Sequence, residues 1–308
     1  MSLRRNSLRL SMVPFVLMFW QTSRHGIDLS RPRVMGIVNV TPDSFFDGGR
    51  HLATDAARAH CDRLVQEGAD ILDIGGESTR PGADPLPAPE ELRRVSPVLE
   101  ALRGRVTVPI SIDTYKAAVA ERALDLGASI VNDVSALAYD PALAGVVARR
   151  GAAVILMHNR GRSADMYAAA AYDDVVGEIG EELLARVEVA RRAGVAADRI
   201  VLDPGLGFAK RAAHSLAALA GLPRLAALGF PLLSGPSRKS FLKAALGDVP
   251  PERRVWGTAA AVTASVLAGA HIVRVHDVAA MVDVVRVADA IRAAGRRADP
   301  DTPPSVPL

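Results

Sequence analysis

The chain has 308 residues, of which 49% are hydrophobic and only 4% aromatic, a composition that suits one large aliphatic core. Its 37 basic and 34 acidic residues leave a net charge of +3, which is too small a field to favour nucleic acid or an anionic membrane. The single cysteine, Cys61, excludes an internal disulfide framework and a thiolate zinc cluster. We therefore expect a cytoplasmic protein with no nucleic-acid or membrane partner, in which Cys61 serves packing.

The two ends of the chain differ in character from the rest. Residues 1–30 form an N-terminal extension in which three arginines precede an apolar run over 10–20, a pattern that resembles a signal peptide. The run is too short to span a bilayer and no cleavage site follows it, so we favour a misassigned start at Met12 or Met18. Residues 296–308 contain four prolines and are expected to be a disordered tail.

Between these ends, strands and helices are predicted to alternate. The first strand is an apolar run over 34–40, which opens after Asn39 into a loop rich in Pro, Asp and Gly. A helix is predicted over 54–67, with Thr54 as its N-cap. Seven further short apolar strands follow at 71–74, 108–112, 130–131, 154–157, 200–202, 230–233 and 272–275. The remaining helices are expected at 90–103, 116–126, 141–150, 173–193, 214–219, 238–246, 257–268 and 278–293.

This alternation sets the expected fold. Short apolar strands separated by amphipathic helices predict a parallel sheet, and eight is the number of strands that closes such a sheet into a (β/α)8 TIM barrel. An open doubly wound sheet is the alternative, and it is weakened by the absence of a G-x-G-x-x-G turn after the first strand. We expect a single α/β barrel domain over residues 31–295.

Polar residues follow the predicted strands at the ends that would share the mouth of the barrel. They are Asn39, Asp73, Asp113, Asn132, His158, Asp203, Lys239, Arg274 and His276. An isolated Asp or Asn in such a place is more often a turn former or a helix cap than a ligand. Because every strand end carries a group of this kind, capping alone does not explain the pattern, and we expect a binding site.

The types of residue indicate the kind of ligand. Asp113, Asn132 and Asp203 offer carboxylate and amide groups that can pair with the edge of a flat, nitrogen-rich heterocycle. A second group of residues, Lys239, Arg274 and His276, suits a phosphate-type anion, and Asn39 offers an oxygen for a divalent cation on it. No H-E-x-x-H, Walker or G-x-S-x-G motif is present, which argues against metalloprotease, P-loop and hydrolase chemistry.

Eight motifs are specific enough to indicate a family. They are Met35–Phe45, Asp73–Gly82, Ser111–Thr114, Val131–Asp133, Leu156–His158, Asp203–Phe208, Ser237–Ser240 and Arg274–Asp277. In order and spacing, over about residues 31–293, they resemble dihydropteroate synthases, the pterin-binding TIM-barrel family. One departure is Phe46, which stands in the first loop where a small polar residue is expected.

The resemblance implies a transferase of folate biosynthesis that is a target of sulfonamides. Such an enzyme condenses (7,8-dihydropterin-6-yl)methyl diphosphate with 4-aminobenzoate and gives 7,8-dihydropteroate and pyrophosphate. It also implies Mg²⁺ as cofactor and a homodimer, for which the helices over 257–268 and 278–293 are the expected contact.

The resemblance further assigns roles to individual residues. The pterin would be held by Asp113, Asn132, Asp203 and Lys239, the diphosphate by Arg274 and His276, and Mg²⁺ by Asn39. Thr79 would contact the diphosphate-bearing substrate, and Phe45, Pro81 and Ser240 would form the aminobenzoate pocket. The residues expected to act in catalysis are Lys239, Asp203, Arg274 and His276.

Two other readings stay open at this point. A methyltetrahydrofolate–corrinoid methyltransferase would share the pterin-binding carboxylates, but would not need the anion-binding groups around Lys239 and Arg274. A catalytically degenerate paralogue would bind pterin without turnover, and it would be expected to have lost Thr79, Lys239 or Arg274. All three are present.

Overall fold

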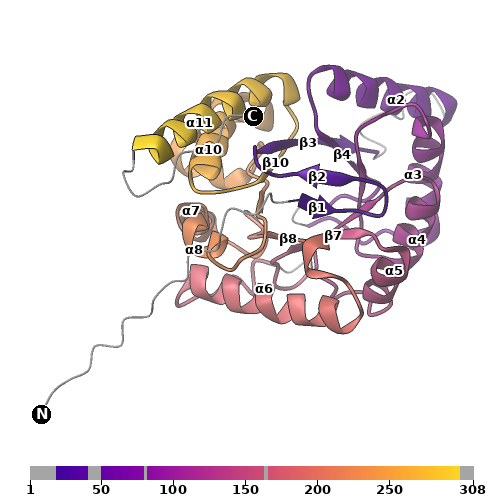
Figure 1. Cartoon of the computed structure of the whole chain (residues 1–308), viewed down its shortest axis with the longest axis horizontal. Helices are drawn as coiled ribbons and strands as arrows, with labels where there is room; N and C mark the ends of the chain where they lie inside the picture. The colour runs from indigo at the N-terminus through magenta and orange to yellow at the C-terminus, as the bar shows by residue number, and fades with distance from the viewer. Residues whose placement is uncertain (1–18, 41–49, 80–81, 163–165, 299–308) are drawn as a thin grey trace, which may run out of the picture.

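The computed structural model describes residues 19–40, 50–79, 82–162 and 166–298, and it shows a ring of helices around a parallel barrel (Figure 1). The barrel strands are β3 (Arg33–Asn39), β4 (Ile71–Gly75), β5 (Ile110–Asp113), β6 (Ile130–Asp133), β7 (Ala153–Met157), β8 (Ile200–Asp203), β9 (Leu233–Ser234) and β10 (Ile272–Val275). They follow the order β8-β7-β6-β5-β4-β3-β10-β9, and all neighbours pair in parallel. A parallel bridge between Leu202 and Leu232 joins the two end strands. The predicted eight-stranded barrel is confirmed.

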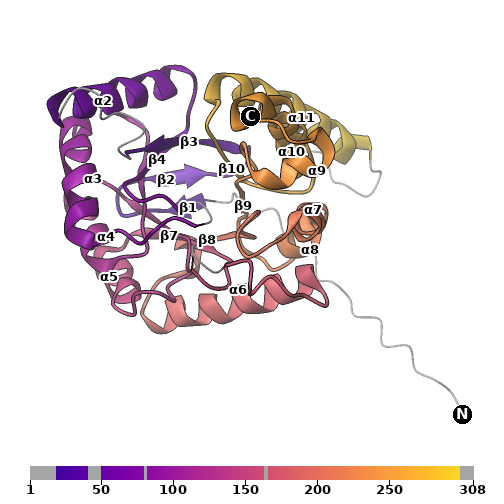
Figure 2. The ribbon, with the colours of Figure 1, turned by 180° about the vertical axis from the view of Figure 1, so that it is seen from behind.

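Helices cover the outside of the barrel in both views (Figures 1 and 2). They are α2 (Arg50–Gln66), α3 (Ala88–Leu102), α4 (Ala117–Asp125), α5 (Leu143–Arg150), α6 (Val175–Arg192), α7 (Ala212–Ala220), α8 (Leu222–Ala226), α9 (Lys243–Leu246), α10 (Val255–Leu267) and α11 (Val278–Ala298). In the described part of the chain, no helix has the length and apolar character needed to cross a membrane.

Two local predictions are wrong. Thr54 does not cap its helix, because α2 begins at Arg50 and the nearest helix-breaking residue upstream is Gly49. The helix predicted over 238–246 is reduced to the short α9, which follows a single 3₁₀ turn. Arg238 has a φ of 57°, a left-handed conformation that a right-handed helix cannot include.

The core has two layers, both mainly aliphatic. The larger layer lies between the strands and the surrounding helices and includes Cys61, which is fully buried. Burial raises the pKa of the Cys61 thiol to about 12, so the residue serves packing and not nucleophilic chemistry. The smaller layer fills the inside of the barrel with one side chain or two from most strands, namely Met35, Ile71, Ile130, Ala153, Ile155, Val201, Leu233 and Ile272.

A short antiparallel hairpin closes the end of the barrel opposite the mouth. It consists of β1 (Phe19–Gln21) and β2 (Gly26–Asp28), which lie across the barrel axis in Figure 1. Trp20 packs with the inner apolar layer and is fully buried, and its indole Nε1 donates to the Arg199 carbonyl at 3.0 Å. Arg199 directly precedes β8, so this contact lies where a strand begins.

The packed body therefore begins before residue 31, where the barrel was expected to start. The first part of the expected N-terminal extension, residues 1–18, lies outside the described residues. At the other end α11 continues to Ala298, and the rest of the expected tail, residues 299–308, is also outside them.

The hairpin gives a testable prediction for stability. Trp20→Ala removes a fully buried aromatic side chain and a hydrogen bond from the barrel floor, and is expected to lower the free energy of unfolding by roughly 3–5 kcal/mol. Phe19→Ala, at the neighbouring and 43% exposed position, is the matched control, with an expected change within about 0.5 kcal/mol. Chemical denaturation measures both; equal effects would mean that the hairpin does not close the core.

Candidate active site

The first cluster at the mouth is an ion network built around Arg274 of β10. Its guanidinium Nε donates to Asp73 Oδ2 at 2.6 Å, and its Nη2 donates to Asp113 Oδ2 at 2.6 Å. Asn132 completes the cluster, because its Nδ2 donates to Asp73 Oδ2 at 3.0 Å. Four residues from β4, β5, β6 and β10 thus present carboxylate, amide and guanidinium groups at one place.

Burial sets the electrostatics of this cluster. Asp73 is fully buried, and its second oxygen, Oδ1, is buried without a hydrogen-bond partner among the described residues. Burial raises the pKa of Asp113 to about 7, while the guanidinium of Arg274 opposes the shift. The cluster therefore contains a carboxylate that binds a proton more readily than usual, and a buried carboxylate oxygen that is still available as an acceptor.

The second cluster joins the end of β8 to the turn after β9. Lys239 Nζ donates to the Leu206 carbonyl and lies 4.4 Å from the centroid of the Phe208 ring. The Asp203 carboxylate accepts from the Gly205 N–H at 2.7 Å. Its negative charge is the strongest electrostatic attraction on the Lys239 ammonium. Burial lowers the pKa of the Lys239 ammonium to about 8, and Asp203 opposes the shift.

The third cluster borders a cavity of ≈ 610 Å³, where Asn39 and His276 both line the wall. The Ser237 hydroxyl accepts from the His276 backbone N–H at 3.1 Å and lies 3.0 Å from its Nδ1. Because a hydroxyl can both donate and accept, Ser237 orients the His276 ring through Nδ1 in either tautomer. Arg238 is held beside this cavity by an ion pair with Asp277, at 2.9 Å from Nε to Oδ2.

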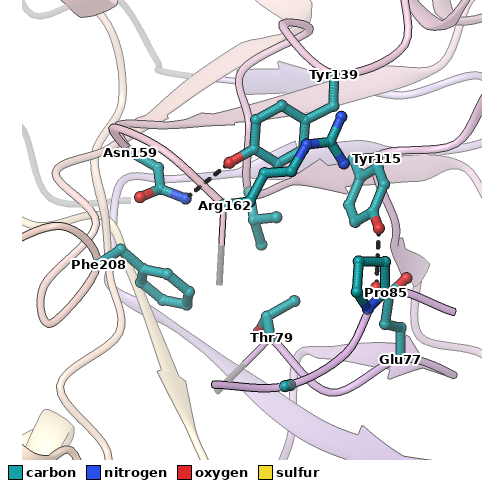
Figure 3. A pocket seen from close by; sticks show the side chains of 10 residues that line it. Glu77, Thr79, Pro85, Tyr115, Tyr139, Asn159, Arg162 and Phe208 are labelled. Carbon is teal, nitrogen blue, oxygen red and sulfur yellow. Dashed lines mark hydrogen bonds between the residues drawn. The ribbon is translucent and has the colours of Figure 1, made fainter. Parts of the chain in front are cut away.

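A smaller cavity of ≈ 60 Å³ lies over the ends of β4 to β8 (Figure 3). Phe208 and Thr79 lie on one side of it, and Tyr115 and Tyr139 lie on the other. The Tyr115 hydroxyl donates to Glu77 at 2.8 Å, which ties the loop after β4 to the end of β5. Phe208 therefore connects this cavity with the Lys239 cluster.

The expected site residues are distributed over these clusters. Asp113, Asn132 and Arg274 form the first, Asp203 and Lys239 the second, and Asn39 and His276 the third, while Thr79 lines the small cavity. Arg274 lies with the carboxylates that are expected to bind the heterocycle, and the described lining of the larger cavity does not include it. Ser240 follows Lys239 and is exposed. Phe45 and Pro81, as well as Phe46, lie outside the described residues.

Three residues of the site were not assigned from the sequence. Asp73 joins Arg274 to Asn132, Ser237 orients His276, and Phe208 lies against Lys239. The strand-end pattern already placed Asp73 at the mouth, but it assigned the residue no role. The contacts of Ser237 and Phe208 depend on how two turns approach each other, which no local pattern reports.

Comparison with known proteins agrees with this geometry. A family model described as Pterin binding enzyme matches residues 35–276. The dihydropteroate synthase of Synechocystis sp. is 48% identical over 261 residues, which are 85% of this chain and 90% of that protein. Two solved structures are also similar. Xanthomonas albilineans dihydropteroate synthase with 4-aminobenzoic acid has a TM-score of 0.84 at 47% identity and covers 90% of this chain and 99% of its own. The Yersinia pestis enzyme in a sulfonamide drug complex has a TM-score of 0.84 at 43% identity, with 90% and 100% covered.

The barrel and its polar mouth thus define a pterin-binding enzyme. Two carboxylates accept from a guanidinium and an amide donates to one of them, while the larger cavity is lined by Arg238 and His276 together with the acidic Glu67 and Asp277. Within this class the chain belongs to the dihydropteroate synthase family, at 48% identity over most of its length.

Proposed function

We propose that this barrel condenses (7,8-dihydropterin-6-yl)methyl diphosphate with 4-aminobenzoate at the mouth formed by the three clusters. The observation that carries the proposal is the Arg274 network, because carboxylates from two strands accept from one planar cation and the Asn132 amide from a third strand donates to one of them. The site of a transferase that joins a heterocycle to an aryl amine needs such an array, with an anion-binding cavity beside it.

The heterocycle is expected to replace the guanidinium of Arg274. A 2-aminopyrimidinone edge offers N–H donors in one plane, as a guanidinium does, and Asp113 and Asp73 accept such donors in the free protein. A pterin that takes over these contacts releases Arg274, which can then serve the diphosphate on the same ligand. This exchange reconciles the position of Arg274 among the carboxylates with its expected role at the anion.

The chemistry needs charge stabilisation at two places. As pyrophosphate departs from the pterin methylene, positive charge develops on carbon and negative charge on the leaving group. Arg274 and the His276 imidazole are suited to the leaving group, and the Asp203 carboxylate to the cationic carbon. The aryl amine is neutral near pH 7 and attacks the methylene, so positioning matters more here than a strong base.

We place Mg²⁺, the expected cofactor, at Asn39 beside the larger cavity. Among the described residues, Asn39 lines this cavity, and no three His, Cys, Asp or Glu side chains group together to hold a metal. This fits a magnesium ion bound mainly through substrate phosphates and water, with one amide oxygen from the protein. When bound, the ion would neutralise charge on the diphosphate.

The aminobenzoate is expected to bind beside Thr79 and Phe208, near Lys239, with Ser240 at the rim. An aromatic ring can stack against Phe208, and the Lys239 ammonium is an electrostatic partner near it. Because the similar Yersinia pestis structure holds a sulfonamide, we expect sulfonamides to compete for this place. We also propose that Phe45 and Pro81 help to form the aminobenzoate pocket, as the family resemblance implies.

The two other readings are less well supported. The reported relatives are dihydropteroate synthases, which does not favour a corrinoid methyltransferase. A degenerate paralogue would be expected to lack Thr79, Lys239 or Arg274, and all three lie at the mouth.

The function is tested by pyrophosphate release with pterin diphosphate, Mg²⁺ and 4-aminobenzoate, each omitted in turn. Release should need all three and should match dihydropteroate formation one to one. Lys239→Ala and His276→Ala are each expected to lower turnover by at least ~10²-fold, since each removes a charged or donating group at the reacting atoms.

Lys243→Ala is the matched control for this test. Lys243 is an exposed lysine of α9, and in the described part of the chain its ion pair is with Asp248. Its turnover should equal that of the wild type. Tight pterin binding without aminobenzoate-dependent release would instead establish the degenerate paralogue, and near-normal turnover of Lys239→Ala would remove its role.

The raised pKa of Asp113 predicts a pH dependence of pterin binding. A protonated carboxyl loses acceptor capacity for the pterin N–H groups, so affinity should fall as the pH drops through about 7, by up to tenfold per unit. Calorimetric titration from about pH 5 to about pH 8 measures the effect. Asp113→Asn should abolish this inflection, whereas Asp203→Asn, at a buried carboxyl of the second cluster, should keep it. An inflection that survives in Asp113→Asn would assign it to another group.

We also propose a homodimer formed through α10 and α11, which pack side by side. Large apolar side chains are exposed on both helices, among them Trp256 at 80%, Val287 at 62% and Ile291 at 54%. A monomer would leave them in water, and a second copy would cover them.

Sedimentation at micromolar concentration tests the dimer. The wild type should sediment as a dimer, and the double substitution Trp256→Glu with Val287→Glu as a monomer, because four buried charges would have to be desolvated in the interface. Leu184→Glu, at a 38% exposed leucine of α6, is the control and should remain dimeric. A monomeric wild type would contradict the proposal.

We place the protein in the cytoplasm. Its one cysteine is buried and unpaired, so the fold requires no oxidising compartment. Cell fractionation with detection of the chain decides this, and its recovery from an oxidising compartment would contradict it.

A further inference from the structure

Lys210 is a buried lysine that the proposed reaction does not use, and burial lowers the pKa of its ammonium to about 7. It lies between β8 and α7 and is only 1% exposed. Its Nζ donates to the Phe208 carbonyl at 3.0 Å, to His158 Nδ1 at 2.8 Å and, more weakly, to the His158 carbonyl at 3.4 Å. Each of the three ammonium hydrogens therefore has an acceptor, as a buried ammonium requires.

His158 continues this network towards the surface. Because Nδ1 accepts from Lys210, the imidazole proton is on Nε2, which donates to Glu182 Oε2 at 3.1 Å. Burial lowers the pKa of His158 to about 4, so the ring is neutral and suited to this double role. Glu182 is fixed in turn by Arg160, whose Nε donates to it at 3.0 Å.

The network holds a loop with an unfavourable backbone. Between β8 and α7, Gly205, Gly207 and Ala209 have φ angles of 66°, 80° and 46°. The left-handed conformation is costly for an alanine, so the loop depends on contacts that hold it in place. Besides Lys210, one such contact is the Tyr172 hydroxyl, which donates to the Ala209 carbonyl at 3.0 Å.

The same loop forms the environment of Lys239. The Leu206 carbonyl accepts from its ammonium, and the Phe208 ring lies 4.4 Å from it. Lys210 binds the carbonyl of Phe208 from the buried side, whereas Lys239 contacts the ring of the same residue. The two lysines thus meet one loop from opposite directions.

We infer that Lys210 is a positioning residue, which holds the 204–209 loop so that Leu206 and Phe208 keep the Lys239 ammonium in place for the aminobenzoate. The inference rests on the proposed function, in which Lys239 acts near that substrate. Lys210 is too deeply buried to reach a substrate itself, so its effect on the reaction passes through the loop.

Lys210→Met tests the inference, because it removes all three donors and keeps most of the side-chain volume. The expected result is a loss of about 10²-fold in kcat/KM for 4-aminobenzoate, as for a small misplacement of a reacting group. The dissociation constant of the pterin diphosphate, which depends on Asp113 and Asn132, should change by less than about threefold. Lys210→Arg keeps a donating cation and should recover part of the loss.

Two further variants separate positioning from a general loss of structure. Lys243→Met, at an exposed lysine, should behave as the wild type. Tyr172→Phe removes one hydrogen bond to the same loop and is expected to fold, with a smaller loss that again falls on aminobenzoate. If Lys210→Met does not fold, Tyr172→Phe still tests whether contacts to this loop affect the aminobenzoate kinetics.

A double-mutant cycle with Phe208→Ala decides whether the effect passes through the loop. If Lys210 acts by placing Phe208, adding Lys210→Met to Phe208→Ala should cost little more than Phe208→Ala alone. Additive losses, an equal loss of pterin affinity, or wild-type kinetics in both Lys210→Met and Tyr172→Phe would overturn the inference.

Failure of the proposed function would be visible separately, as an absence of turnover in the wild-type chain. In that case a crystal structure of Lys210→Met still tests the inference. The Phe208 ring should move from its place against Lys239 while the inner barrel stays unchanged. An unmoved Phe208 would overturn the positioning role whatever the reaction is.

Discussion

The mouth of this barrel depends on closure of the parallel sheet. Arg274 pairs with Asp73 and Asp113, which are 201 and 161 residues away in the sequence. Pairing of β10 with β3, of β3 with β4 and of β4 with β5 brings these strand ends together, and the bridge between Leu202 and Leu232 closes the sheet on the other side. Buried charges without partners are costly, so the ion network and the closed barrel require each other.

In the free protein the cations of the mouth already have partners. Arg274 is held by carboxylates and Lys239 by a carbonyl and the charge of Asp203, while Lys210 is held by backbone and imidazole acceptors. Such groups contribute little to stability, since desolvation offsets most of their attraction. The aliphatic layers must supply the stability, and the polar groups are then fixed in orientation before substrate arrives. Charge stabilisation by fixed groups is what a reaction with a departing diphosphate needs.

Much of the fold, and much of the site, could be predicted from the sequence. The strands were recognisable because each is a short apolar run, and Asp113, Asn132, Asp203 and Arg274 because they stand at strand ends. The hairpin of β1 and β2 was not predicted, because each strand has only three residues and shows no periodicity that distinguishes it from a loop. The predicted helix over 238–246 failed because the positive φ of Arg238 is set by tertiary contacts, among them its ion pair with Asp277. The contact between Phe208 and Lys239 could not be predicted, because it depends on how two loops approach each other in the folded chain.

One spacing along the strands nevertheless relates the Trp20 hairpin, the inner apolar layer and the polar mouth. Ile71, Ile130, Val201 and Ile272 belong to the inner apolar layer, and two residues further along each strand stand Asp73, Asn132, Asp203 and Arg274. Residues i and i+2 of a strand face the same side and are separated by about 6.6 Å along it. The polar layer at the mouth therefore lies directly above the apolar layer, two residues further along each strand. The hairpin with Trp20 seals the apolar side, and chemistry is therefore confined to the other end. Read in this register, Asp73 belongs with the three residues that were assigned as ligands, since it occupies on β4 the position that they occupy on their own strands.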